Sequence, residues 1–285
     1  TVVTNHAEFF YTGYCDHANT CDKWMNGCGN CPQATWHYGI SADKTARRSK
    51  QMKEAFTGFK RLCVTSVSLW VYTRSTTSPI MEGVRQLTIE NGINTDVFTI
   101  NANASAALKE KLGMRAEERV VLHVTASFSN TRQQKGGAFL LELAQKFDDV
   151  WFVVAGPHAN DFTVPHNMLL LGNITDQHEL ALLYAMADLC VLTSERETFG
   201  LSVAESLCCG TPVIGFCAGG PESIAMPDYS AFCPFGDVHA LEDLMRTKWL
   251  TYKQSHEACQ ISREAKDKYS SDLMGWKYMK LYEEM

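Results

Sequence analysis

The chain has 285 residues, enough for about two domains that each bury a hydrophobic core of their own. Its composition, with 45% hydrophobic and 20% charged residues, excludes a low-complexity or collagen-like protein. The formal net charge of −6 argues against a protein built to bind nucleic acid. No apolar run reaches the roughly 18 residues that a membrane span needs, and the chain opens directly into a strand-like segment. Together with the cysteine content discussed below, these features lead us to expect a cytoplasmic protein.

The first 94 residues predict a less regular set of elements than the rest of the chain. Strands are expected at residues 1–5, 62–66 and 85–90, a helix at 41–56 and the start of another helix at Ser68. The last of these strands leads into N-G-I-N-T-D-V-F, whose Asn-Gly pair is a turn signal. We place a domain boundary there, near Asn94.

The cysteines raise a separate question. Eleven cysteines, an odd number that cannot all pair, favour free thiols in a reducing compartment. Four of them fall within one short segment, at Cys15, Cys21, Cys28 and Cys31. Four thiolates can complete a tetrahedral structural zinc site, which would order a loop that lacks a core of its own. A zinc ion, free thiols and a redox pair all stay open, with His17 and His37 as substitute ligands.

From residue 95 onward, apolar strands alternate with helices of about 10 to 12 residues. Strands are predicted at 120–126, 150–155, 168–171, 189–193, 211–216 and 231–234, and helices at 136–147, 176–187 and 199–209. Strands that are apolar throughout indicate a parallel sheet covered on both faces. Right-handed crossovers then predict a doubly wound, Rossmann-like domain. From His239 the chain is predicted to be helical, with a break near Ser270–Ser271.

Residues 194–225 carry the clearest chemical signal. A strand ends at Ser194, Glu197 lies in the loop that follows, and a helix starts at Phe199–Leu201. Free backbone N–H groups at a helix start, together with the helix dipole, bind anions. Glu205 lies in the second turn of the same helix. Two carboxylates beside an anion site suit a sugar nucleotide, whose sugar and ribose hydroxyls flank a diphosphate.

At this segment the chain resembles the family-4 glycosyltransferases, which are retaining enzymes of the GT-B fold. Their pattern is S-x-x-E-x-F-G-L-x-x-x-E-A-x-x-x-G-x-P-V, and the chain reads S-E-R-E-T-F-G-L-S-V-A-E-S-L-C-C-G-T-P-V, with Ser206 for the usual Ala. Further matches in the family's order are L-x-x-x-Y-x-x-A-D at 180–188, Lys135-Gly136, the turn at 172–174 and N-G-I-N-T-D-V-F.

The resemblance implies an α/β fold of the GT-B type: two Rossmann-like, doubly wound parallel-sheet domains that face a cleft. Residues 1–94, with the cysteine-rich loop at 15–31, are then the remaining half of the acceptor-side domain. Residues 95–269 are the donor-nucleotide-binding domain, and 270–285 form a helix that crosses back to the first domain. The family's first domain is longer than this one, so we expect an N-terminally truncated chain that has little or no activity alone.

The resemblance also assigns site residues. The side chain of Glu197 contacts the transferred sugar, Glu205 contacts the ribose, and Lys135 neutralises the leaving diphosphate. The diphosphate is held by the backbone N–H groups of Phe199, Gly200 and Leu201, and the base by Asn173 and Ile174. An Arg of the family is Asn130 here, and Arg132 replaces it if residues 127–134 fold differently. His6, just past a strand, reaches the sugar or acceptor. Lys135 as a solvated lysine and His6 as a structural residue are the alternatives.

The sequence therefore predicts a retaining hexosyltransferase that moves a sugar from a UDP- or GDP-sugar to an acceptor hydroxyl, with no catalytic metal and no nucleic-acid partner. Its cysteine-rich loop resembles that of bacterial capsular and extracellular polysaccharide enzymes, whose acceptor is a glycan or a lipid-linked sugar. Basic residues in 43–53 contact the inner face of the plasma membrane in one interpretation and form a solvated helix face in the other. A sugar-nucleotide epimerase and a non-catalytic nucleotide-binding fragment are the alternative functions.

Overall fold

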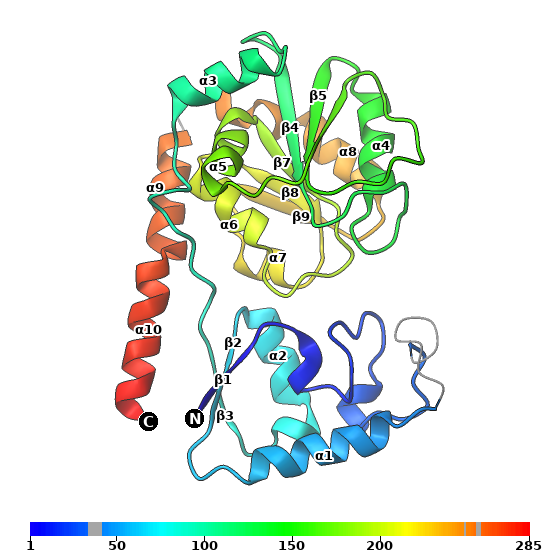
Figure 1. Cartoon of the computed structure of the whole chain (residues 1–285), viewed down its shortest axis with the longest axis vertical. Helices are drawn as coiled ribbons and strands as arrows, with labels where there is room; N and C mark the ends of the chain where they lie inside the picture. Colours follow the sequence, from blue (N-terminus) through cyan, green and yellow to red (C-terminus); the bar gives the residue numbers. More distant parts are fainter. Residues whose placement is uncertain (34–41, 248, 255–257) are drawn as a thin grey trace. The chain divides into compact units, whose positions relative to one another are not determined.

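The computed structural model describes residues 1–33, 42–247, 249–254 and 258–285, and the chain divides into two compact units (Figure 1). Unit 1 comprises Thr1–Asn91 and Trp276–Met285, and unit 2 comprises Gly92–Gly275. Each unit has a parallel sheet of its own, so the predicted α/β fold with two Rossmann-like sheets is confirmed. Helix α10 (Ser271–Glu284) begins in unit 2 and ends in unit 1.

Unit 1 is built on a three-stranded parallel sheet in the order β1-β2-β3. The strands are Val2–Asn5, Cys63–Ser66 and Arg85–Thr88. The central strand β2 is buried along its whole length. Helix α2 (Leu69–Thr77) begins after the predicted Ser68, whose hydroxyl accepts the N–H of Val71 and so caps the helix.

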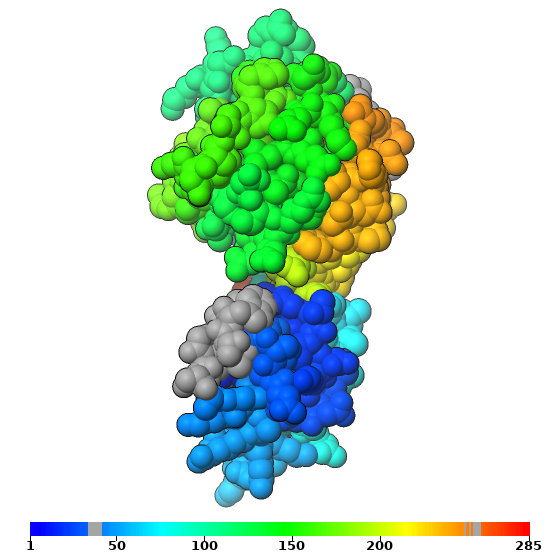
Figure 2. All heavy atoms as spheres, turned by 90° about the vertical axis from the view of Figure 1, so that its right-hand side faces the viewer, coloured from blue at the N-terminus to red at the C-terminus, as the bar shows by residue number. Residues whose placement is uncertain are grey.

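The remaining helices of unit 1 are α1 (Thr45–Thr57) and three short 3-10 turns: η1 (Glu8–Phe10), η2 (Lys23–Asn26) and η3 (Pro79–Met81). Helix α1 starts later than predicted, and Ser41 lies outside the described residues. The cysteine-rich loop (dark blue) and α1 (lighter blue) lie side by side on the surface in Figure 2, and the N–H of Cys31 donates to the Asp43 carboxylate beside α1.

The cysteine-rich loop packs on a small core that it shares with η1 and α2, which the sequence analysis did not expect. The buried carboxylate of Glu8 accepts hydrogen bonds from Tyr11 Oη (3.0 Å), from the N–H of Ala18 and from Arg74 of α2. The Arg74 guanidinium also lies over the rings of Trp24 and Trp70, 4.7 and 4.8 Å from their centroids. A buried ion pair inside an aromatic cluster therefore helps to order the loop.

Unit 2 contains a six-stranded parallel sheet in the order β6-β5-β4-β7-β8-β9. The strands are β4 (Arg119–Val124), β5 (Val150–Ala155), β6 (Met168–Gly172), β7 (Leu189–Leu192), β8 (Val213–Phe216) and β9 (Ser230–Cys233). From β4 the chain adds two strands on one side, returns to β7, and adds two more on the other side. This is the strand order of a doubly wound Rossmann fold, as the sequence predicted.

Helices cover both faces of this sheet (Figure 1). They are α3 (Ala102–Lys111), α4 (Gly137–Lys146), α5 (Gln177–Met186), α6 (Leu201–Cys208), α7 (Gly220–Ile224), α8 (Val238–Thr247), the 3-10 turn η4 (Trp249–Gln254) and α9 (Ala258–Tyr269). The predicted break near Ser270–Ser271 is confirmed, because α9 ends and α10 begins there. Helices α3 and α7 were not predicted. In the C-terminal stretch, residues 248 and 255–257 lie outside the described residues.

None of the helices in the described part of the chain combines the length and apolar character of a membrane span.

Candidate functional site

The sheet of unit 2 changes its winding direction between the neighbouring strands β4 and β7. In open α/β sheets, ligands bind beyond the carboxyl ends of the strands at such a switch point. The loop after β4 carries Lys135, and the loop after β7 carries Glu197 and leads into α6. The strongest chemical signals of the sequence therefore come together at the place where the topology favours a ligand.

Lys135 and Glu197 form an ion pair across these two loops. Lys135 Nζ donates to Glu197 Oε1 at 2.5 Å, and the two side chains are 32% and 23% exposed. An ion pair that water reaches contributes little to stability. Both groups are thus available to a ligand, the ammonium for a phosphate and the carboxylate for hydroxyl groups.

The loop that holds Lys135 is attached to the end of β7. The Thr193 hydroxyl donates to the carbonyl oxygen of Lys135 at 2.7 Å, and the N–H of Glu195 donates to the carbonyl oxygen of Gln134 at 2.6 Å. Gly136 has φ +64°, and a Cβ there would lie 2.2 Å from the Thr193 carbonyl oxygen. Glycine is required at position 136 because the two backbones approach so closely.

The backbone of Glu197 is fixed by the loop after β8. Its N–H donates to the carbonyl oxygen of Ala218 at 3.0 Å, and its carbonyl oxygen accepts the N–H of Gly220 at 2.8 Å. The Glu222 carboxylate in turn accepts the N–H groups of Ala218 and Gly219 at 2.9 and 2.7 Å. The sequence analysis did not select Glu222. A sequence signal was present, because Glu222 stands at the third position of a helix that starts with Gly220-Pro221, and a glutamate at that position typically caps a helix start.

Helix α6 begins without a cap, as the sequence predicted. Gly200, the residue just before the helix, has φ +88°, and no side chain caps the helix. Within the described residues, the backbone N–H groups of Phe199, Gly200 and Leu201 donate to no protein group. A Cβ at position 200 would lie 2.9 Å from Pro221 Cγ, so both the space and the left-handed φ favour glycine at this helix start. Unpaired N–H groups and the helix dipole together make an anion site.

Glu205 lies one turn further along α6. Tyr184 Oη on α5 donates to Glu205 Oε2 at 2.9 Å. Burial raises the pKa of Glu205, and the hydrogen bond from Tyr184 opposes that rise. In the described part of the chain, Oε1 accepts no hydrogen bond and stays available to a ligand hydroxyl. The Tyr of the L-x-x-x-Y-x-x-A-D segment thus positions the second glutamate of the pattern.

The charges of Lys135 and Glu197 also act on His123, which the sequence analysis did not select. It lies in β4 with 1% of its surface exposed, and its Nδ1–H donates to the Val191 carbonyl oxygen at 2.9 Å. Burial lowers the pKa of His123 to about 4, with smaller and opposite effects of Lys135 and Glu197. Nε2 is buried and has no partner among the described residues. The sequence alone gives no reason to select a histidine inside an apolar strand, since it follows the pattern of a core residue.

Arg132 occupies a different environment from the Lys135–Glu197 pair. Its guanidinium donates to Glu142 Oε2 on α4 at 2.8 Å and lies over the Phe139 ring, 4.8 Å from the centroid. Its side chain is 60% exposed, so this ion pair is weak and replaceable. Its predicted role in donor binding stays a prediction.

Asn173 and Ile174 follow β6, the edge strand of the sheet, directly after Gly172 (φ +76°). The Asn173 side chain is exposed and Ile174 is half-buried. Strand β5 separates β6 from β4. His6 belongs to unit 1, where it is exposed just after the end of β1. The base-binding and acceptor roles of these residues stay predictions.

The four clustered cysteines line one cavity of about 10 Å³ together with Trp24 and Lys23. All four are free thiols, and burial, followed by neighbouring thiols, raises the pKa of Cys15 to about 12. In the described ranges, however, no group of three or more His, Cys, Asp or Glu side chains is placed to hold a metal ion. The geometry thus gives no support to the predicted zinc site, which stays a prediction. His37 lies outside the described residues.

Comparison with known proteins points to one family. A family model described as "Glycosyl transferases group 1" matches residues 105–266. The N-acetyl-alpha-D-glucosaminyl L-malate synthase of Bacillus anthracis is 30% identical over 145 residues, which is 48% of this chain and 37% of that protein. A D-inositol 3-phosphate glycosyltransferase of Mycobacterium sp. (strain KMS) is 31% identical over 145 residues, covering 46% and 32%. The match spans about a third of the length of these relatives.

Solved structures share the fold over more of the chain. The sucrose-phosphate synthase of Thermosynechococcus elongatus matches 99% of this chain and 67% of its own, with a TM-score of 0.71 and 21% identity. Anabaena HepE in complex with UDP-glucose matches 83% of this chain and 68% of its own, with a TM-score of 0.65 and 19% identity.

Proposed function

The chain belongs to the group 1 glycosyl transferases, and we propose that it binds a UDP- or GDP-sugar and transfers the sugar, with retention, to an acceptor hydroxyl. The observation that carries this proposal is the Lys135–Glu197 ion pair beside the uncapped start of α6. A cation, a carboxylate and unpaired backbone N–H groups at one switch point match the parts of a nucleotide sugar. Structures of HepE with UDP and with UDP-glucose favour uridine as the base.

In this proposal the diphosphate binds to the backbone N–H groups of Phe199, Gly200 and Leu201. Each hydrogen bond to a charged group contributes about 1.5 to 3 kcal/mol. Lys135 leaves Glu197 for the diphosphate oxygens, because two full negative charges attract an ammonium more strongly than one carboxylate does. Glu197 is thereby released to accept hydrogen bonds from the hydroxyls of the sugar.

The remaining site residues hold the ends of the donor. Glu205, already positioned by Tyr184, binds the ribose hydroxyls through its available oxygen. Asn173 and Ile174 contact the base, and Arg132 supplies a second cation after it leaves Glu142. His6 acts on the sugar or the acceptor.

The transfer step follows from the charges around the diphosphate. The bond between the anomeric carbon and the diphosphate oxygen breaks, and negative charge grows on the leaving oxygen. Lys135 and the N–H groups of α6 stabilise that charge, so the chain itself supplies what a catalytic metal supplies elsewhere. The acceptor oxygen attacks the same face of the sugar, and its proton passes to the leaving diphosphate. This sequence of events retains the configuration at the anomeric carbon.

The wider role that we propose is sugar transfer in bacterial capsular or extracellular polysaccharide synthesis, in the cytoplasm or at the inner face of the plasma membrane. The acceptor is then a glycan or a lipid-linked sugar. A sugar-nucleotide epimerase would turn over the donor without an acceptor. Product analysis with the donor alone therefore distinguishes the two reactions.

Nucleotide binding tests the site assignment, because binding can be measured on a chain that matches only part of its relatives' length. We expect UDP and UDP-glucose to raise the melting temperature of the chain more than other nucleotides do, since binding stabilises the folded state. Glu197→Gln should weaken UDP-glucose binding about tenfold relative to UDP binding, because only UDP-glucose has the sugar that the carboxylate holds, whereas both ligands lose the same competitor for Lys135. Equal weakening for both ligands would contradict the assigned role.

A further inference from the structure

A second concentration of positive charge lies at the beginning of α1, in unit 1. Residues 44–53, K-T-A-R-R-S-K-Q-M-K, contain five cations and no acidic residue, in a chain whose net charge is −6. Lys44, Arg47, Arg48 and Gln51 follow the i, i+3, i+4, i+7 spacing that places side chains on one helix face. Thr45, Ser49 and Phe56 form the buried face.

These cations stand at the unfavourable end of the helix. The N-terminus of a helix carries positive partial charge, which favours anions and repels lysine and arginine. The first turn of α1 contains no acidic residue. Asp43, just before it, accepts the N–H groups of Thr45 (2.9 Å) and Cys31 (2.8 Å), and these hydrogen bonds lower the pKa of its carboxyl group. Asp43 is thus the one acidic residue in positions 42–48, which hold three cations.

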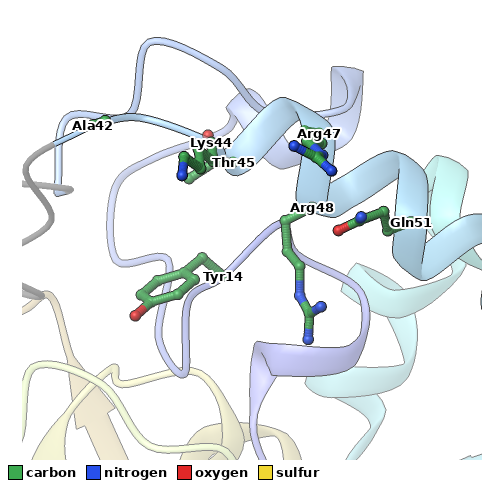
Figure 3. Close-up of a pocket in the computed structure, with 7 residues that line it drawn as sticks. All are labelled: Tyr14, Ala42, Lys44, Thr45, Arg47, Arg48 and Gln51. Carbon is green, nitrogen blue, oxygen red and sulfur yellow. The ribbon is translucent and has the colours of Figure 1, made fainter.

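The cationic face of α1 opens on a cavity of about 390 Å³ (Figure 3). Its lining consists of Tyr14 from the cysteine-rich loop and Ala42, Lys44, Thr45, Arg47, Arg48 and Gln51. Figure 3 shows the Arg48 side chain projecting away from α1 on the side where the Tyr14 ring lies. In the described part of the chain, the Lys44, Arg47 and Arg48 side chains have no ion-pair or hydrogen-bond partner.

We propose that this cavity binds a phosphate or diphosphate group, and that this group belongs to the acceptor. The assignment of the phosphate to the acceptor rests on the proposed transferase function, whereas phosphate binding in the cavity does not. Two guanidinium groups offer planar pairs of N–H donors that match phosphate oxygens. An anion there removes the mutual repulsion of three cations and complements the helix dipole. Tyr14, Thr45 and Gln51 then surround the group attached to the phosphate.

The volume of the cavity agrees with a ligand larger than a simple ion. Pockets of about 300 to 1,000 Å³ hold small organic molecules. A phosphorylated sugar or the diphosphate end of a lipid-linked sugar fits the charge and the volume, whereas a neutral glycan leaves all three cations unpaired. The structure therefore favours a phosphate-bearing acceptor over a neutral one.

Calorimetric titration of the full chain with inorganic pyrophosphate tests the site, with saturating UDP present to occupy the α6 start. We expect one pyrophosphate per chain, at least tenfold weaker binding for Arg47→Ala and Arg48→Ala, and less than twofold weaker binding for Lys50→Ala. Lys50 carries the same charge on the same helix but does not line this cavity. No pyrophosphate binding, or equal loss in all three variants, would overturn the proposal. Far-UV circular dichroism confirms that each variant is folded.

Vesicles identify the source of the phosphate. Phosphatidylcholine vesicles that contain phosphatidic acid expose a phosphate monoester, and those that contain phosphatidylserine carry negative charge without one. Arg48-dependent binding to the first kind alone supports a lipid-borne phosphate, and pyrophosphate binding without vesicle binding supports a soluble one. Equal binding to both kinds of vesicle, unchanged in Arg48→Ala, indicates a surface-charge effect and overturns a phosphate site. UDP affinity measured in the same samples reports on the donor proposal separately.

Discussion

The starts of α6 and α1 both carry additional positive potential, and they achieve it in opposite ways. At α6 the potential comes from the backbone, since Gly200 leaves three N–H groups without a protein acceptor. At α1 it comes from side chains, because Lys44, Arg47 and Arg48 stand where the helix dipole disfavours them. The arrangement at α6 requires close backbone packing, whereas the arrangement at α1 requires none. The two sites should therefore respond differently to substitution and to pH.

The largest difference should come from glycine replacements. Gly136→Ala places a Cβ 2.2 Å from the Thr193 carbonyl oxygen, and we expect it to lower the free energy of unfolding by about 3 to 4 kcal/mol. Gly83 of unit 1 has φ +76° with open space around it, so Gly83→Ala should cost about 1 kcal/mol. Urea unfolding of both variants measures the contrast. Equal losses would show that the β4–β7 loops are not tightly packed.

Acid should destabilise the region around His123 in β4 before it affects the start of α1. The folded-state pKa of His123 is lowered by burial to about 4, below its ordinary value of 6.5. The stability that depends on neutral His123 is complete above pH 6.5 and is lost as the pH falls from 6.5 to 4. The loss amounts to roughly 3 kcal/mol at about 1.4 kcal/mol per pKa unit. His123→Phe should remove this slope, whatever its stability at pH 7.

The α1 site should resist the same change of pH. Hydrogen bonds from Thr45 and Cys31 lower the pKa of Asp43, so the stability due to its charge is lost only at still lower pH. Comparison of unfolding curves at pH 7, 6, 5 and 4.5 for the chain and for His123→Phe measures the effect. An unchanged slope in the variant would mean that another group causes the loss.

The smallest effect concerns the stability of α1 itself. Because its cations oppose the helix dipole and one another, Arg47→Ala/Arg48→Ala should raise the free energy of unfolding by about 0.5 kcal/mol at low salt. The gain should disappear near 1 M salt, where charges are screened within about 3 Å. A loss of stability at low salt would instead show that the two arginines are structural.

The sequence predicted the sheet of unit 2 well, because each strand is an apolar run bounded by turn residues. Strand β5 at Val150–Ala155 has the predicted limits, and β8 begins two residues later than predicted. Helix α3 was missed because A-N-A-S-A-A-L-K-E-K has no apolar period. Helix α7 was missed because its five residues depend on the Glu222 carboxylate rather than on a pattern.

Contacts between distant residues explain what else the sequence did not reveal. The core of the cysteine-rich loop depends on Glu8 and Arg74, which are 66 residues apart. The Lys135–Glu197 pair joins residues 62 positions apart, and only the family pattern related them before the fold was known. His123 became a candidate through its burial beside that pair. The cationic face of α1 was visible as a charge run, but its cavity required the position of Tyr14.

Calorimetric titration with UDP tests the proposed donor site at the start of α6 most directly. The account predicts that the unmodified chain binds one UDP, and that Lys135→Ala weakens this binding about 10- to 30-fold through loss of one charge-assisted contact of about 1.5 to 2 kcal/mol. Arg119→Ala removes one positive charge from an ion pair with Asp149 at the start of β4, the opposite end of that strand, and it should leave UDP affinity unchanged. Absence of UDP binding, or equal affinity in both variants, would contradict it.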